Sequence, residues 1–263
     1  MRLLKEIKPC AAAFVRSLWH PDAVRTNGDT SLLRLIALIT MAIDHFGKMC
    51  FPQVPEMRLI GRLAFPLFAY GIAAGAVYTK NPTKYLSRIV LMALICQPLY
   101  AIGLAHENRA MYAVPFTQNP FGAISAFYLN SWQKPSILLS LALGLCILLC
   151  LRNRQWILAI GFYLLCERMS AKLDYGVEGI RLMLLFYALC EHPKLALIVW
   201  SAYMIRWSRG LGYEILGLDF GMRIFALPAV ILCAIPMKRY FILPKWLVYG
   251  FYPAHLIALM LVS

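Results

Sequence analysis

Long apolar runs, separated by short polar or proline-containing stretches, recur along almost the whole of this chain. Of its 263 residues, 61% are hydrophobic and 14% are charged, and the mean hydropathy is +0.67. A soluble domain is about half apolar and about a quarter charged. Repeated apolar runs of helical length are typical of segments that lie in a lipid bilayer. The sequence therefore predicts an integral membrane protein.

The apolar runs number about nine, and several are shorter than the roughly 20 residues that a straight helical span requires. They cover approximately residues 31–51, 59–79, 86–105, 136–151, 156–170, 177–191, 194–207, 223–236 and 245–262. We predict an all-α fold, a polytopic helical bundle of about nine spans (roughly eight to ten), with the central runs tilted, re-entrant or merged. Residues 31–263 are expected to form a single transmembrane domain. Residues 1–30 are expected to form a basic cytoplasmic or interfacial segment.

Basic residues are in excess, with 26 lysines and arginines against 12 acidic residues and a net charge of +14. In a soluble protein this excess suggests a nucleic-acid partner, but no basic stripe with interleaved aromatic residues is present, so none is expected. With the N-terminus in the cytoplasm, fourteen basic residues fall on the cytoplasmic side and about ten on the other, as the positive-inside rule favours. Residues 106–135 then form a long external loop, and such loops are often lids or binding loops.

Several well-known kinds of site are absent from the sequence. Most of the eight cysteines lie within or at the ends of apolar runs, where cysteine behaves as a small hydrophobic residue. The sequence contains no CxxC motif, no glycine-rich phosphate loop, no HExxH and no GxSxG. We therefore predict no metal site and no disulfide framework.

The first apolar run carries a cation and an imidazole, which are costly within a membrane and are there often functional. Arg34 and His45 are eleven residues apart, so on a helix they differ by only about 20° in direction and lie roughly 16 Å apart along the axis. This arrangement suits an anionic ligand whose far end reacts at the histidine. Adjacent helical residues point about 100° apart, so Asp44 is expected to pair with a cation on another helix, with Arg62 or Lys48 as candidates. The alternative is a structural ion pair beside a water-facing histidine.

The second run begins with Arg58 and Arg62, four residues apart and therefore on one helix face. Small residues follow, and Pro66 removes a backbone donor inside the run, which favours a kinked helix beside a cavity. Tight helix packing with snorkelling arginines is the alternative.

Two later segments add polar residues of the same kind. The stretch DYGVEGIR, residues 174–181, places Tyr175 and Glu178 at a helix entrance, either as a polar lip to a cavity or beside a capping aspartate. The stretch FYPAHL, residues 251–256, places Tyr252 and His255 on one face of the last run. Gln97, before a proline in the third run, is a weaker pocket candidate.

Several of these motifs together resemble the TraX family. They are IALITMAIDHFGK, MRLIGRLAFPLFAYGIAAG, NPTKYLSRI, DYGVEGIRLMLLFY and FYPAHLIAL, and the resemblance covers roughly residues 31–262. The namesake of the family is the F-pilin N-terminal acetylase of conjugative plasmids. The first run is also similar to the Arg/Lys-x10-His signature of acyltransferase-3-type membrane enzymes. The chain departs from the family pattern at Gln97, where an acidic residue is expected, and in the turn before the last run.

The resemblance implies a multi-pass acetyltransferase of the bacterial inner membrane that uses acetyl-CoA as acyl donor. His45, with the adjacent Asp44, is then the expected catalytic motif, and Arg34 and Arg62 are the expected contacts to the donor. The remaining candidates line the pocket: Arg58, Gln97, Tyr175, Glu178, Tyr252 and His255. The acceptor is expected to be an amine or hydroxyl of a pilin-like protein or a surface glycan.

Two other classes of function remain open on the residues alone. A transporter or channel would use the polar residues as a conduction path, and paired inverted repeats would support it. A non-catalytic assembly protein would need no ionisable pair at depth.

Overall fold

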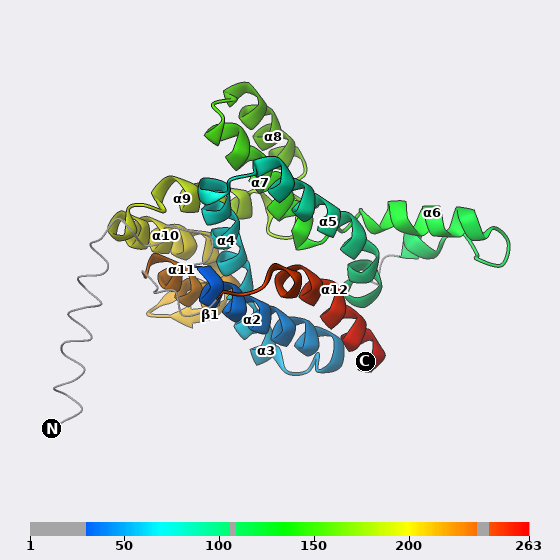
Figure 1. Cartoon of the computed structure of the whole chain (residues 1–263). Coiled ribbons are helices and arrows are strands. Elements are labelled where there is room, and N and C mark those ends of the chain that lie inside the picture. Colours follow the sequence, from blue (N-terminus) through cyan, green and yellow to red (C-terminus); the bar gives the residue numbers. More distant parts are fainter. Residues whose placement is uncertain (1–29, 106–108, 236–241, 263) are drawn as a thin grey trace. The chain divides into compact units, whose positions relative to one another are not determined.

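The computed structural model describes residues 30–105, 109–235 and 242–262, and most of these residues are helical (Figure 1). They form two compact units, and three of the boundaries between them fall within helices α2 (Ser31–Cys50), α3 (Pro55–Gly61) and α9 (Gly176–Leu189). The first unit holds residues 30–41, 59–78, 182–235 and 242–243, and the second holds residues 42–58, 79–105, 109–181 and 244–262. The predicted N-terminal segment, residues 1–30, lies outside the described residues except for Thr30.

The first unit contains the beginning of α2, the end of α3, all of α4 (Ala64–Tyr78) and the end of α9. It continues with α10 (Pro193–Ser208), the hairpin β1 (Arg209–Ile215) and β2 (Leu218–Phe220), η3 (Met222–Ala226) and α11 (Leu227–Ala234). Alanines and glycines make up much of α4 and are buried, which allows α11 to pack closely against it.

Three aromatic rings form the core of the first unit. Tyr70 on α4, Phe186 on α9 and Trp200 on α10 are almost completely buried. The Phe186 and Trp200 rings meet edge to face with centroids 4.7 Å apart, and Tyr70 meets both in the same manner. The Trp200 indole N–H donates to the Leu185 carbonyl at 2.9 Å. Such aromatic pairs are each worth about 0.5–1.5 kcal/mol beyond the area that they bury.

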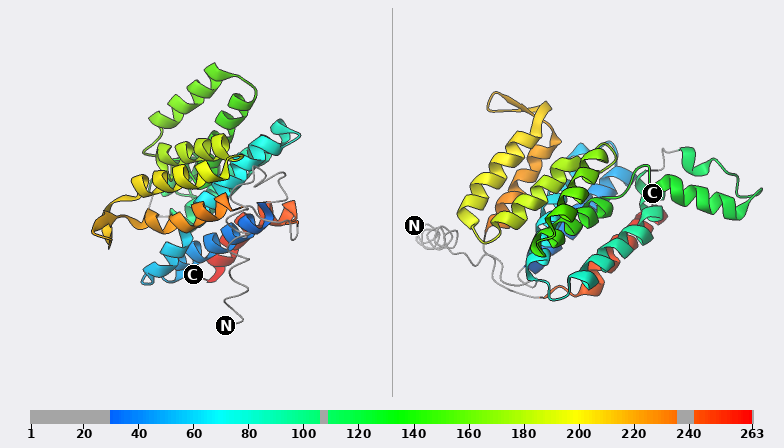
Figure 2. Two further views of the ribbon diagram at one scale, coloured as in Figure 1. Left: turned by 90° about the vertical axis from the view of Figure 1, so that its left-hand side faces the viewer. Right: turned by 90° about the horizontal axis from the view of Figure 1, so that it is seen from above.

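The second unit contains the end of α2, the beginning of α3, α5 (Pro82–Leu104), η2 (Arg109–Tyr112), α6 (Pro120–Ser131), α7 (Ile137–Arg152), α8 (Trp156–Arg168) and α12 (Lys245–Val262). The beginning of α9 also belongs to it. Helix α5 is central, because α6, α7 and α12 all pack against it. Figure 2 shows α5 and α12 side by side. Asn81 caps α5 by accepting from the Lys84 N–H at 2.9 Å, and Pro82 begins the helix.

Three segments in the described part of the chain are long and apolar enough to cross a membrane. They are Pro55–Tyr78, Pro82–Leu104 and Lys245–Val262. Helix α2 has 20 residues but carries Arg34, Asp44 and Lys48, and these charges set it apart from an ordinary lipid-facing span. The all-α membrane architecture is thus supported, while the count of about nine spans stays a prediction.

Two regions differ from the sequence expectation. Residues 106–135, expected to form a long loop, contain helix α6, which Asn119 caps by accepting from the Gly122 N–H at 2.8 Å. The second difference is the β-hairpin over Arg209–Phe220, where no strand was expected. An apolar-run criterion does not detect either, because α6 interleaves apolar residues with glycine, serine and asparagine, and the hairpin interleaves them with glycine and charge.

Candidate functional site

Two histidines that were predicted separately meet in the second unit. His45 lies near the end of α2, and His255 lies in the middle of α12. The Nδ1 atom of His45 is 2.7 Å from Nε2 of His255, and the two rings are nearly parallel, with centroids 5.0 Å apart. A direct hydrogen bond therefore joins the two imidazoles, although 210 residues separate them along the chain.

A backbone carbonyl fixes the direction of this hydrogen bond. Nδ1 of His255 lies 2.8 Å from the Phe251 carbonyl oxygen, one helical turn earlier. A carbonyl only accepts, so Nδ1 of His255 carries the hydrogen, and Nε2 of neutral His255 is then an acceptor. The bond between the rings accordingly requires the hydrogen on Nδ1 of His45. This assignment leaves Nε2 of neutral His45 with a free lone pair.

The imidazole pair has one partly exposed member and one buried member. His45 is half-buried, whereas His255 is buried. The printed bond of His45 uses Nδ1, so the Nε2 atom is the one that remains for a reactant. A histidine with one nitrogen held by a second group and a lone pair on the other has the arrangement of a general base.

Tyr252 lies against both imidazoles. Its ring meets His45 and His255 edge to face, with centroids 6.3 and 5.5 Å apart. The side chain is 5% exposed, and its hydroxyl has no hydrogen-bond partner among the described residues. A buried hydroxyl without a partner costs about 1–3 kcal/mol. The Tyr252 hydroxyl is thus a donor that a bound molecule would satisfy.

Asp44, the residue before His45, takes part in an ion pair. Asp44 accepts from Arg58 on α3 at 3.3 Å. The helices approach closely because residue 47 is glycine, and a Cβ there would lie 2.6 Å from the Met57 Cβ. The expectation that Asp44 pairs with a cation on another helix is met, and the cation that the structure places there is Arg58. The expected candidates Arg62 and Lys48 did not include it.

Two further residues, Tyr100 in the third apolar run and Asp174 in the DYGVEGIR stretch, belong to the same polar cluster. The phenol of Tyr100 on α5 lies within electrostatic reach of Asp174, Tyr175, Arg58 and Asp44. The phenol of Tyr252 lies within reach of Tyr100 and Asp174 as well. The available sequence signal was the position of Tyr100 beside Pro98 in an apolar run, and that of Asp174 directly before Tyr175.

The expected donor contacts Arg34 and Arg62 fall in the first unit, on separate elements. The Arg34 side chain lies on Gly71 of α4, where a Cβ would be 3.7 Å from its Nε atom. Arg62 occupies the tight turn between α3 and α4, and its N–H donates to the Leu59 carbonyl at 3.2 Å. The Arg34 side chain thus packs against α4 at a position that has no side chain of its own.

Gln97 is fully buried, and its amide makes structural contacts. Its Nε2 donates to the carbonyls of Ser131 at 2.7 Å and Lys134 at 3.2 Å, and its Oε1 accepts from the Ser136 N–H at 2.8 Å. These bonds join α5 to the turn between α6 and α7. The neutral amide suits this role because it donates and accepts at once.

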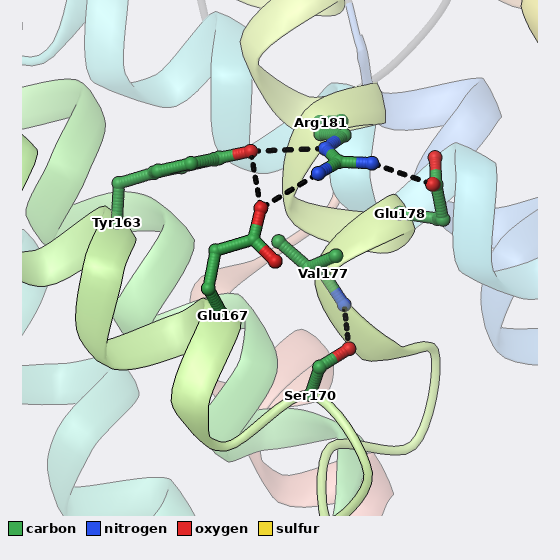
Figure 3. A network of polar contacts seen from close by, with 6 residues as sticks. All are labelled: Tyr163, Glu167, Ser170, Val177, Glu178 and Arg181. Atoms are coloured by element: carbon green, nitrogen blue, oxygen red, sulfur yellow. Dashed lines mark hydrogen bonds and ion pairs between the residues drawn. The ribbon is translucent and has the colours of Figure 1, made fainter.

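Glu178 is held in a network between α8 and α9 (Figure 3). Arg181 donates to Glu178 and to Glu167, each at 2.6 Å, and its Nε donates to the Tyr163 hydroxyl at 2.9 Å. The Tyr163 hydroxyl donates in turn to Glu167 at 2.8 Å. The three donor groups of Arg181 are therefore each engaged, and the network fixes the angle between α8 and α9.

Comparison with known proteins assigns the chain to a family. It matches the family described as TraX protein over residues 29–263. The chain belongs to the TraX family. This membership confirms the resemblance that the first, second and last apolar runs indicated.

Two relatives match this TraX protein over part of its length. It is 30% identical over 80 residues to a probable fimbrial assembly protein FimC, serogroup H1, of Dichelobacter nodosus, covering 29% of this chain and 33% of that protein. It is 39% identical over 66 residues to the uncharacterized protein RP591 of Rickettsia prowazekii (strain Madrid E), covering 25% of each. The matches thus span a third or less of these relatives. No solved structure matches the chain.

Proposed function

We propose that this TraX protein is an integral-membrane acetyltransferase. It transfers the acetyl group of acetyl-CoA to an amine or hydroxyl of a pilin-like protein or a surface glycan. The observation that carries the proposal is the hydrogen bond between His45 and His255, whose direction supports a neutral His45 with its lone pair on Nε2. A scaffold protein has no need of such a pair at depth in an apolar helix.

His45 acts as the general base in the proposed reaction. Its Nε2 takes the proton from the acceptor amine or hydroxyl while that group attacks the thioester carbonyl. The new C–N or C–O bond forms, the C–S bond breaks, and His45 returns the proton to the departing thiolate. A positioned base of this kind contributes about 10²–10⁴-fold to the rate. In a two-step variant, Nε2 attacks the thioester and carries the acetyl group itself.

The neighbouring polar groups supply stabilisation for the tetrahedral intermediate. The Tyr252 hydroxyl lies beside both imidazoles and lacks a partner in the described part of the chain. A preorganised donor in a site that excludes water stabilises a developing oxyanion more than the same donor does in water. We assign this role to Tyr252, with Asp44 and Arg58 as the ion pair that completes the polar lining.

The donor binds through the cation at the other end of α2. Arg34 precedes His45 by eleven residues on this helix, which corresponds to roughly 16 Å along its axis. An arginine is well suited to hold a phosphate by two parallel hydrogen bonds. In this proposal Arg34 and Arg62 bind the phosphates of the donor, and the pantetheine arm extends toward His45.

The acceptor assignment rests on the comparisons. Membership of the TraX family and the likeness to a probable fimbrial assembly protein both fit a membrane function connected with pili. A pilin-like protein is therefore the first acceptor to test, and a surface glycan is the second.

The test measures transfer of radiolabelled acetyl from acetyl-CoA by the purified protein, with each acceptor in turn. We expect His45→Ala to lose about 10²–10⁴-fold in rate while it remains folded. His192→Ala is a matched control, because His192 is an exposed histidine whose side chain makes no capping bond at the start of α10. Transfer at the wild-type rate by His45→Ala would refute the proposal.

A further inference from the structure

The proposed reaction leaves the β-hairpin of the first unit without a role. Strands β1 and β2 connect α10 to η3, and the hairpin extends beyond the ends of α10 and α11 (Figure 2). Its pairs are Tyr213 with Phe220, Glu214 with Asp219, and Ile215 with Leu218. Residues that pair directly share a face of the hairpin, so one face is apolar and the other carries two carboxylates.

The apolar side of this hairpin is open at its tip. Phe220 is buried at the base, but Leu211 is 91% exposed and Leu216 is 98% exposed. Ile215 and Leu218, which pair directly before the turn, are also exposed. Three aliphatic side chains, Ile215, Leu216 and Leu218, thus gather at the end of a projecting element, and Leu211 is exposed nearer its base. Such an exposed apolar group marks a surface that contacts an apolar partner.

The turn residue strengthens this interpretation. Leu216 and Gly217 form the two-residue turn with φ angles of 53° and 72°. Such turns strongly prefer asparagine or aspartate followed by glycine, because both central residues adopt the left-handed conformation. A bulky leucine is strained there. In water, both the backbone conformation of Leu216 and the exposure of its side chain would be unfavourable. We therefore expect this side chain to contact an apolar environment.

Three arginines encircle the base of the hairpin, each held on an aromatic ring. The guanidinium of Arg206 lies 5.1 Å from the Tyr203 centroid, that of Arg209 lies 5.4 Å from Phe220, and that of Arg223 lies 5.5 Å from Trp207. All three arginines are exposed. Tyrosine, tryptophan and arginine are the residues that membrane proteins place at headgroup depth.

We propose that this hairpin is an interfacial anchor whose apolar tip, at Ile215, Leu216 and Leu218, inserts among the acyl chains of the bilayer. The three arginines then lie at the level of the headgroups and bind lipid phosphates. Glu214 and Asp219 stay on the opposite face, toward water. The charge at the base favours anionic lipid, because each basic residue near the surface adds to the attraction.

The order of the aliphatic, aromatic and cationic side chains along the hairpin indicates lipid, and not another protein, as the partner. On the apolar face the tip is aliphatic and the base is aromatic and cationic, while the Glu214–Asp219 pair between them lies on the other face. That sequence of layers matches the gradient from acyl chains to phosphates in a bilayer. The inference concerns the first unit alone and does not depend on the proposed acetyl transfer.

The test compares two single substitutions in the full-length protein, Leu216→Cys and Glu214→Cys, in vesicles of phosphatidylethanolamine and phosphatidylglycerol. A water-soluble maleimide reacts with the thiolate, which forms in water and not among acyl chains. Glu214→Cys is the matched control, since it lies on the polar face two residues away. Labelling of the native cysteines, measured in the unsubstituted protein, is subtracted.

We expect position 216 to label several-fold more slowly than position 214 in vesicles, and both to label fully in sodium dodecyl sulfate. An environment-sensitive fluorophore at position 216 is expected to be quenched by lipids that carry a nitroxide on the acyl chain. Equal labelling at the two positions would overturn the proposal. Protection without lipid quenching would overturn it too, since it would indicate a protein contact at the tip.

Discussion

At the scale of single residues, the arrangement of the two histidines depends on one backbone carbonyl. The Phe251 carbonyl binds Nδ1 of His255, and His255 in turn binds Nδ1 of His45. This order gives His255 the part that a carboxylate plays in a catalytic triad, which is to hold the tautomer and orientation of the base. In the proposed reaction His255 is therefore a positioning residue for His45.

Substitution of His255 tests this role. We expect His255→Ala to lower kcat by about 10- to 100-fold, the usual cost of removing a group that orients a functional histidine, with KM for acetyl-CoA unchanged. His255→Gln places an amide acceptor near the former Nε2 position and is expected to recover part of the loss. Steady-state kinetics of the two variants make the comparison. An identical loss in both, or a change confined to KM, would contradict a positioning role.

Substitution of Arg34 is expected to change KM, whereas substitution of His255 is expected to change kcat. If it binds a phosphate, Arg34→Ala removes a charge-assisted interaction worth about 1.5–3 kcal/mol, so KM for acetyl-CoA rises about tenfold or more. The turnover number is expected to change less, because the lost contact is made equally in the ground state and the transition state. Arg34→Lys keeps the charge and serves as the comparison. A fall in kcat at constant KM would indicate a structural arginine.

The sequence indicated the individual residues of the site better than their partners. The depth of Arg34 and His45 in an apolar run, and the spacing of Tyr252 and His255, were visible as patterns along the chain. The bond between His45 and His255 was not, because α2 and α12 meet through long-range packing that no local pattern encodes. The same holds for Arg58 beside Asp44, which depends on the missing Cβ of Gly47.

At the scale of helices, Gln97 shows how a departure from a family pattern is accommodated. Its amide satisfies two carbonyls and one N–H in the turn between α6 and α7. We therefore interpret Gln97 as a structural residue that links α5 to the turn between α6 and α7 by hydrogen bonds. Hydropathy located the run that contains it, but it could not reveal α6, since a short capped helix with mixed residues gives no apolar run.

Removal of the hydrogen bonds of the Gln97 amide is expected to destabilise the second unit. Gln97→Leu fills a similar volume but leaves buried backbone groups unpaired, at about 1–3 kcal/mol for each group without water. We expect a clearly lower midpoint of unfolding in a detergent titration followed by circular dichroism. Gln133→Ala, an exposed position in the same turn, should stay close to wild type. Equal midpoints for all three proteins would show that the amide contributes little.

At the scale of the whole molecule, two hydrogen bonds show which charged groups of the second unit lie at each end of the α5 span. Arg152, at the end of α7, donates to the Thr79 carbonyl before α5 at 2.9 Å. The ends of α5 and α7 that adjoin Lys80, Lys84, Arg152 and Arg154 therefore lie together. At the opposite end of α5, the Leu104 carbonyl accepts from Lys48 at 2.5 Å. Lys48 lies one helical turn after His45 on α2. The basic end and the imidazole pair thus lie toward different ends of the α5 span.

The positive-inside rule assigns the basic end to the cytoplasm, which predicts that His45 acts in the half of the membrane away from it. Cysteine labelling in intact cells checks the orientation, with Lys80→Cys and Asn153→Cys for the basic end and Gln133→Cys for the turn before α7. With an impermeant maleimide, we expect the first two to label only after the cells are permeabilised, and Gln133→Cys to label at once. The reverse pattern would place the imidazole pair toward the cytoplasm. In that case a cytoplasmic acceptor would reach His45 directly, and the donor would have to enter from the opposite end of α2, away from the soluble acetyl-CoA of the cell.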